Sequence, residues 1–162
     1  NNMRREDRRI TEDNEIVDIL HSAEIVHLGL MDEGYPYIVP LHYGFIYEDG
    51  KLTLYMHGAV EGKKLDLIRS NENAFIEIDN NNGIVSGGEI PCRYGAAYAS
   101  IMAKGKAEIV ENVEEKIKGL ELLMSNQTHR NFEITPMMTR SVSVIKFSAE
   151  EMSAKARKVA AK

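Results

Sequence analysis

Apolar side chains recur along the chain with two different spacings, and these spacings predict the secondary structure. Intervals of three and four residues predict amphipathic helices over residues 12–22 and 60–70, and a third helix that begins after Asn112. Thr11 and Asn112 are the expected N-caps of the first and third helices, with Glu115 at the capping-box position. Between the helices the apolar period changes to two, which predicts a mainly β protein.

The alternation of apolar and polar residues is clearest between residues 36 and 57. Residues 36–47 form one predicted strand, which ends at Asp49-Gly50, a dipeptide typical of a tight hairpin turn. In the return strand, 51–57, one face carries Leu52, Leu54 and Met56, and the other carries Thr53, Tyr55 and His57. The sequence therefore predicts an antiparallel hairpin whose Leu52 face fills the core.

Four further predicted strands are 25–30, 74–79, 98–110 and 140–147. Residues 80–97 are rich in Asn and Gly and contain Pro91, which predicts a long functional loop. The segment from Ala149 onward is rich in Lys and Ala, and we expect a weak terminal helix there. Six strands joined by hairpins and single helices predict an antiparallel barrel that is closed or nearly closed.

Length and charge narrow the class of protein. The 162 residues predict a single domain, residues 3–155, followed by a basic C-terminal tail at 156–162. The net charge of −5 conceals basic ends and an acidic body, so the body lacks the continuous basic surface that nucleic-acid binding needs. We expect the basic ends to be solvated tails. Because no apolar run is long enough for a membrane span and Cys92 has no partner cysteine, we expect a cytoplasmic protein without membrane contact.

The histidines and the cysteine show no spacing typical of a metal site or a catalytic nucleophile. The five histidines form no HxH or HExxH pattern, and the chain lacks GxSxG and the dinucleotide-binding GxGxxG. His27, inside an apolar strand, is expected to be a hydrogen-bonded residue of the sheet. The sequence therefore predicts no metal site.

Residues 55–65 carry the strongest chemical signal. They lead from a strand through Gly58 and Gly62 into a helix whose first turn holds Lys63 and Lys64. The helix dipole disfavours each cation there by about 0.3–1 kcal/mol, whereas a bound phosphate would reverse the sign of this interaction. The segment therefore indicates a phosphate site, and lysines that simply point into water are the alternative.

Pro40 lies inside the predicted strand 36–47. Because proline cannot donate a backbone hydrogen bond, this stretch belongs at an edge or an interruption of the sheet. The free backbone groups of Val39, Leu41 and His42 could then meet the polar edge of a planar ligand. A plain edge proline is the alternative.

These motifs, in this order, resemble the FMN-binding split-barrel family. The matching segments are 36–45, the Asp49-Gly50 hairpin, 55–59, 61–65, 3–8, 91–92, 98–100 and 105–110. The chain is most similar to the pyridoxamine-phosphate-oxidase-like branch that contains the 5-nitroimidazole-resistance (Nim-type) proteins. The resemblance covers residues 3–155 and implies a six-stranded antiparallel split β-barrel, which forms a homodimer with FMN in a groove between the subunits.

The resemblance also implies the residues of the cofactor site. Lys63 and Lys64 would hold the FMN phosphate. The isoalloxazine ring would be lined by Val39, Pro40, Leu41, His42 and Tyr43. Further contacts with the ring or the substrate would come from Met56, His57, Tyr98 and Ser100, the last two in the same chain or across the dimer. His57 is the candidate catalytic residue, on the substrate side or as a proton-handling group.

The function implied is an FMN-dependent oxidoreductase that reduces a small aromatic or heteroaromatic acceptor, such as a nitroimidazole. The alternative is a non-catalytic flavin-nucleotide protein for storage, sensing or electron carriage. Pyridoxamine-phosphate oxidation ranks lower, because it needs a second basic cluster and the sequence shows only isolated arginines in the body. Two departures from the family pattern, Ala97 in place of a frequent Arg and Lys104 in place of a bulky apolar residue, concern the substrate side of the site.

Overall fold

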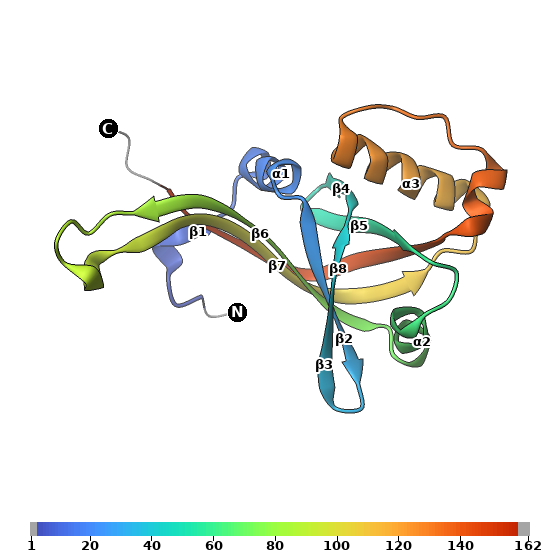
Figure 1. Cartoon of the computed structure of the whole chain (residues 1–162), viewed down its shortest axis with the longest axis horizontal. Coiled ribbons are helices and arrows are strands. Elements are labelled where there is room, and N and C mark those ends of the chain that lie inside the picture. The colour runs from blue at the N-terminus through green and yellow to red at the C-terminus, as the bar shows by residue number, and fades with distance from the viewer. Residues whose placement is uncertain (1–2, 159–162) are drawn as a thin grey trace.

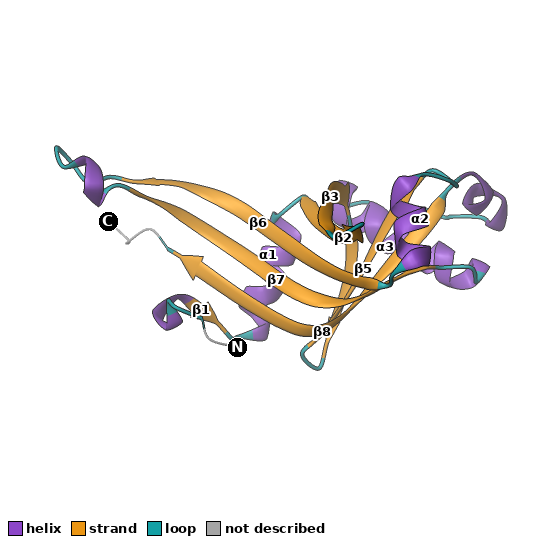
Figure 2. Ribbon diagram, turned by 90° about the horizontal axis from the view of Figure 1, so that it is seen from below, coloured by secondary structure: helices purple, strands orange, loops and turns teal. Residues whose placement is uncertain are grey.

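A twisted antiparallel sheet runs through residues 3–158, the part of the chain that this computed structural model describes (Figures 1 and 2). Its strands are β1 (Arg9–Ile10), β2 (Ile25–Asp32), β3 (Tyr35–His42), β4 (Gly44–Glu48), β5 (Lys51–Gly58), β6 (Asn73–Val85), β7 (Gly95–Ile109) and β8 (Ser143–Arg157). Their order in space is β3-β2-β6-β7-β8-β5-β4, and β1 adds to β8. The mainly β antiparallel fold is confirmed, with eight strands in the described residues where six were predicted.

Alternating side chains of these strands meet in one apolar core. Leu28, Leu54, Ile76, Ile101 and Phe147 are completely buried, although they come from five different strands. Each fully buried side chain of this size contributes about 1.5–3 kcal/mol relative to an exposed one. The core therefore holds the inner face of the sheet together.

The predicted strand 36–47 is two strands that belong to different parts of the sheet. β3 pairs with β2, and after Tyr43 the chain enters β4, which pairs with β5. β3 and β4 are the two ends of the strand order, so this one-residue connection brings the ends of the sheet together. The sheet therefore rolls up into a split β-barrel.

The helices of the described residues are α1 (Asp13–Ser22), α2 (Lys63–Ser70) and α3 (Val113–Thr128). Asn112 caps α3 as predicted, because its side-chain oxygen accepts a hydrogen bond from the backbone N–H of Glu115 at 2.9 Å. The predicted cap at Thr11 is wrong: Glu12 is the N-cap of α1, and its side chain makes no capping hydrogen bond. None of the helices in residues 3–158 is long and apolar enough to cross a membrane.

α3 lies against β4 and β5 at one end of the sheet (Figure 1). Gly44 allows this approach, because a Cβ at that position would lie 2.3 Å from the backbone nitrogen of Leu123. A second apolar cluster, built around Tyr55, Leu120 and Val144, fills the space between helix and sheet. Tyr55 therefore belongs to a covered face of β5, whereas His57, two residues further along, lies at the end of that face.

The long loop predicted over residues 80–97 is wrong. β6 continues to Val85 and β7 begins at Gly95, so that only residues 86–94 connect them. The two strands form an arm that extends beyond the barrel (Figure 1). Their pairing is irregular between Asn81 and Ile84, where Gly83 has a φ of 104°. The polar composition of this segment reflects an exposed hairpin with a distorted register.

The chain ends are also part of the sheet. The predicted helix from Ala149 onward is instead the second half of β8, which pairs with β7 and, at Lys155, with Arg9 of β1. Hydrogen bonds to the neighbouring strands outweigh the intrinsic helix preference of these lysines and alanines, because helix propensities differ by only about 0.7 kcal/mol per residue among ordinary residues. The N-terminal basic segment therefore does not form a solvated tail. Of the predicted tail at 156–162, Ala156 and Arg157 belong to β8, and residues 159–162 lie outside the described part.

Candidate functional site

The turn between β5 and α2 brings glycines and basic side chains into one corner of the molecule. β5 ends at Gly58, and α2 begins at Lys63 with Gly62 as its N-cap. Gly62 has a φ of 150°, which favours glycine, and it makes no side-chain cap for the helix. The first N–H groups of α2, at the positive end of the helix dipole, therefore suit an anion.

The two lysines at the start of α2 have different surroundings. The Nζ of Lys63 lies 2.7 Å from a carboxylate oxygen of Asp32 and 5.0 Å from the ring centroid of Tyr37. Hydrogen bonding and charge from Asp32 raise the pKa of Lys63. Lys64 instead extends back toward β5, where a Cβ on Gly58 would lie 2.7 Å from its Nζ. Within residues 3–158, Lys64 has no carboxylate at ion-pair distance.

His42 and His57 lie near Lys64. The β4–β5 pairing ends with Gly44 opposite Tyr55, and His42 lies close enough to His57 for its charge to act on the His57 ring. Burial lowers the pKa of His57, and the charges of His42 and Lys64 lower it further. His57 is therefore neutral near pH 7, and its ring can donate one hydrogen bond and accept another. We call the group Lys63, Lys64, His42 and His57 the basic corner.

β3 supplies the sheet edge that was expected to face the flavin ring. It stands at one end of the strand order, so Pro40 lies on an edge strand as its missing N–H predicts. Val39 and Leu41 are half-buried against the core, whereas Pro40 and His42 are exposed. A planar ligand that followed this edge toward the basic corner would meet the backbone groups of β3.

Two residues of the expected ring environment belong to the core instead. Tyr43 is 1% exposed, and its hydroxyl lies 2.6 Å from the backbone oxygen of Leu20 and 3.1 Å from that of Ala23. Burial raises the pKa of Tyr43 well above its usual range. Met56 is completely buried on the inner face of β5. Neither side chain reaches the surface of the chain, so Tyr43 would have to contribute to a ring site through its backbone.

Tyr98 and Ser100 lie on the arm, away from the basic corner of the same chain. The segment just after α2 contacts the other end of β7, where the N–H of Ala107 donates to the backbone oxygen of Glu72. At about 3.3 Å per residue, the stretch from Tyr98 to Ala107 spans roughly 30 Å. A single chain therefore does not bring Tyr98 and Ser100 to Lys64.

Two cations surround Tyr98, which the sequence did not predict. Nη1 of Arg8 donates to the Tyr98 hydroxyl at 3.2 Å, and the Nζ of Lys155 lies 5.8 Å from the ring centroid. Arg8 and then Lys155 lower the pKa of Tyr98. Ala97, which stands where the resemblance leads us to expect Arg, is 1% exposed, and Arg8 is a cation beside Tyr98.

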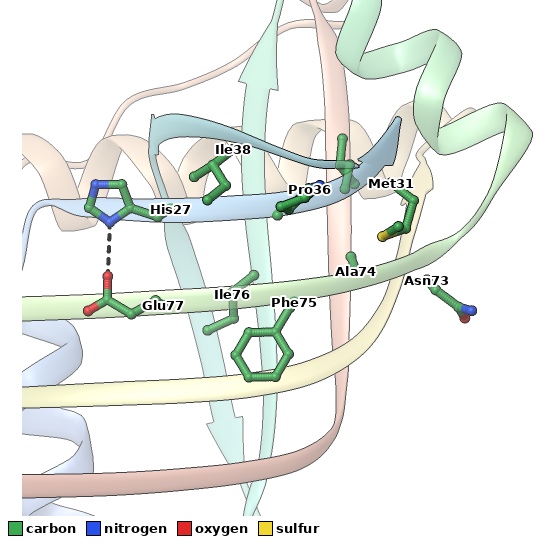
Figure 3. Close-up of a pocket in the computed structure, with 11 residues that line it drawn as sticks. His27, Met31, Pro36, Ile38, Asn73, Ala74, Phe75, Ile76 and Glu77 are labelled. Carbon is green, nitrogen blue, oxygen red and sulfur yellow. Dashed lines mark hydrogen bonds and ion pairs between the residues drawn. The ribbon is translucent and has the colours of Figure 1, made fainter. Parts of the chain in front are cut away.

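The outer face of β2, β3 and β6 carries a pocket that the apolar pattern did not predict. Its volume is about 430 Å³, with Met31, Ile38 and Phe75 along its apolar part and His27 and Glu77 at its polar end (Figure 3). The three apolar side chains are 44%, 62% and 48% exposed. Nδ1 of His27 lies 3.0 Å from Oε2 of Glu77, so His27 is a hydrogen-bonded sheet residue as expected. His27 and Glu77 meet because the register of β2 and β6 places them opposite each other, and this register could not be predicted from the sequence.

The rolled sheet and the basic corner together define a split-barrel protein with a basic corner beside an exposed sheet edge. A family model described as pyridoxamine 5'-phosphate oxidase matches residues 12–156. The crystal structure of a candidate 5-nitroimidazole antibiotic resistance protein from Bacteroides thetaiotaomicron is 32% identical, with a TM-score of 0.76 over 91% of this chain and 86% of that chain. The chain belongs to the pyridoxamine 5'-phosphate oxidase family.

More distant structures share the fold. The flavocytochrome Anf3 from Azotobacter vinelandii is 18% identical, with a TM-score of 0.77 over 98% of this chain and 73% of its own. The FAD and heme binding protein from Mycobacterium smegmatis is 17% identical, with a TM-score of 0.77 over 96% of this chain and 76% of its own. No curated protein matches the chain significantly.

Proposed function

We propose that this protein is a cytoplasmic, FMN-binding oxidoreductase that reduces small aromatic or heteroaromatic acceptors such as nitroimidazoles. The observation that carries the proposal is the basic corner, in which Lys64 stands at a helix start without a carboxylate partner in the described residues. The similarity to a candidate 5-nitroimidazole resistance protein supports the class of acceptor. The fold shared with a flavocytochrome and with an FAD and heme binding protein supports a flavin.

The residues of the basic corner fit the phosphate of FMN. Gly58 leaves the space in which the Lys64 ammonium group lies, and Gly62 leaves the first N–H groups of α2 without a side-chain cap. An anion at this place would gain a charge-assisted contact from Lys64 and the favourable end of the helix dipole. Lys63 would take a smaller part, because a phosphate must compete with Asp32 for it.

When bound, FMN would supply the electron transfer. This chain would position the ring and control protons around it. The β3 edge near Val39 and Leu41 would offer backbone hydrogen-bonding groups to the polar edge of the ring. His57, neutral and exposed beside Lys64, would keep a proton on its imidazole and donate a hydrogen bond to the flavin or to the acceptor.

We also propose a homodimer, formed through the outer face of β2, β3 and β6. Met31, Ile38 and Phe75 are exposed there on neighbouring strands, and an apolar patch of this kind marks an association surface. A two-fold arrangement would pair the patch with itself. The β3 edge forms only one wall for a planar ring, and the partner's Tyr98 and the partner's Ser100 would supply the second.

The absorbance spectrum of the purified, untagged protein tests the cofactor. We expect flavin bands, and chromatography of the released cofactor should identify it as FMN. A protein that remains colourless after addition of FMN would refute the proposal. Recovery of FAD alone would refute the choice of FMN.

An anaerobic assay tests the reaction. The protein is reduced with NADPH or another reductant, a nitroimidazole is added, and reoxidation of the flavin is followed together with the reduced product. A bound flavin with no turnover on any acceptor would favour the non-catalytic alternative. Oxidation of pyridoxamine phosphate by O₂ would favour the lower alternative, for which the Arg8–Lys155 pair at Tyr98 offers a second basic cluster.

A further inference from the structure

Three potential metal ligands meet on the outer face of β2 and β6, next to the strand β3 that ends at His42. Glu77 and Asp79 are two apart on β6, so their side chains lie on the same face. His27 is the direct cross-strand partner of Glu77 on β2. One ligand atom from each of the three lies within 4.8 Å of the other two. We call these residues the β2–β6 triad.

The spacing of the triad suits a single ion. Two ligands of a tetrahedral zinc site with bonds near 2.1 Å lie roughly 3.4 Å apart, and Nδ1 of His27 is already 3.0 Å from Oε2 of Glu77. An ion between them would need only a small opening of this contact. In the single chain His27 and Glu77 are half-buried and Asp79 is exposed. The triad borders the proposed dimer surface, because Glu77 follows Phe75 on β6, and Asp79 is the triad residue of β6 furthest from Phe75.

The scaffold of the triad is rigid and its charge is not balanced by lysine or arginine. The residues that alternate with the triad, Val26, Ile76 and Ile78, are completely buried and hold both strands in place. Within residues 3–158, neither carboxylate has a lysine or arginine at ion-pair distance, and the cross-strand partners on β7 are Met102 and Ser100. Two carboxylates therefore face one imidazole without a fixed cation.

We propose that His27, Glu77 and Asp79 bind one divalent transition-metal ion per chain, with zinc as the representative ion. One imidazole nitrogen and two carboxylate oxygens form a mixed donor set that suits zinc and similar ions, whereas magnesium is bound through oxygen ligands and water. Because the ligands come from two strands that are far apart in the sequence, no spacing motif predicts this site. The proposal does not rest on flavin binding.

The test is equilibrium dialysis of the untagged full chain against Zn²⁺, with the bound metal measured by atomic absorption. A Cys92→Ser background removes the exposed thiol as an alternative ligand. We expect one zinc per chain, retained in an excess of Mg²⁺. His27→Gln and Asp79→Asn should each weaken zinc binding by at least about tenfold, since even the loss of residues that only support metal ligands costs 10–100-fold.

A matched control removes one imidazole and one carboxylate elsewhere. His21→Gln with Asp18→Asn changes two exposed residues of α1 and should leave zinc binding unchanged. Because Asp79 is exposed, the Asp79→Asn variant should fold normally, and circular dichroism is the check of its fold. Zinc binding equal to wild type in both triad variants, or displacement of zinc by equimolar Mg²⁺, would overturn the proposal.

Discussion

Replacing Lys64 with methionine removes a charge from the basic corner while it keeps most of the length of the side chain. Lys64 lies against Gly58 and has no carboxylate at ion-pair distance in the described residues, so its ammonium group is available to a phosphate. Lys63 provides an internal comparison, because its Nζ is already 2.7 Å from Asp32. The two lysines should therefore contribute unequally to FMN binding.

The expected size of the effect follows from the net value of a charge-assisted hydrogen bond, about 1.5–3 kcal/mol. Since 1.4 kcal/mol corresponds to a factor of ten, Lys64→Met should weaken FMN binding by roughly 10- to 150-fold. Lys63→Met should have a smaller effect on FMN binding. Lys63 already pairs with Asp32, so a contact with the phosphate would weaken that ion pair and the net gain in binding free energy would be smaller. The double variant Lys63→Ala, Lys64→Ala should be folded and colourless.

The assay is titration of flavin-free protein with FMN and with riboflavin, followed by flavin fluorescence. Riboflavin lacks the phosphate, so it should bind the wild type and the Lys64→Met variant equally weakly. Lys118→Met, on an exposed position of α3, is the control and should bind FMN as the wild type does. Circular dichroism of each variant confirms that the fold is retained.

Two outcomes would refute this reasoning. If Lys64→Met binds FMN as tightly as the wild type, the phosphate lies elsewhere. If it loses FMN and riboflavin to the same extent, Lys64 supports the ring site or the local fold and does not contact a phosphate.

Four further predictions concern His57, the core and the proposed dimer. His57→Gln should retain FMN but change turnover. The pKa of His57 is lowered in the folded state, so its contribution to stability is present above the ordinary pKa near 6.5 and is lost as the pH falls. The free energy of unfolding of His57→Gln in urea should therefore depend less on pH between 8 and 5 than that of the wild type. An unchanged pH dependence would contradict the lowered pKa of His57. Tyr43→Phe leaves buried carbonyl groups without their donor and should lower the free energy of unfolding by about 1–3 kcal/mol, and a variant as stable as the wild type in urea would show that this hydrogen bond is dispensable. Gly44→Ala places a Cβ 2.3 Å from the backbone of Leu123 and should cost about 1–3 kcal/mol or more by the same measurement, unless α3 moves away freely. Ile38→Glu should convert a dimeric wild type into monomers in light scattering, and a monomeric wild type with flavin bound would contradict the proposed dimer.

Local features of this protein could be predicted from the sequence, because they depend on residues only a few positions apart. The Asp49-Gly50 turn sets the β4–β5 hairpin, and the Asn112 side chain reaches the N–H of a residue three positions on. Lys63 and Lys64 lie in the first turn of α2 as the preceding glycines indicated. Alternation alone predicted that Met56 lies on the inward face of β5. The resemblance nevertheless suggested a place for Met56 near the flavin ring.

The tertiary structure decided where local preferences are overridden, and which residues far apart in the sequence come into contact. The lysines and alanines after Ala149 favour a helix weakly, but two neighbouring strands with unpaired backbone groups make a strand of them. Tyr43 is a core residue because the chain changes strand partners there, which alternation within residues 36–47 cannot express. The contacts Asp32–Lys63, Arg8–Tyr98 and His27–Glu77 depend on the strand register and on how the sheet rolls up. A shift of one residue would turn a strand's side chains to the opposite face, so these contacts are set by the burial of the whole inner face and not by the residues that form them.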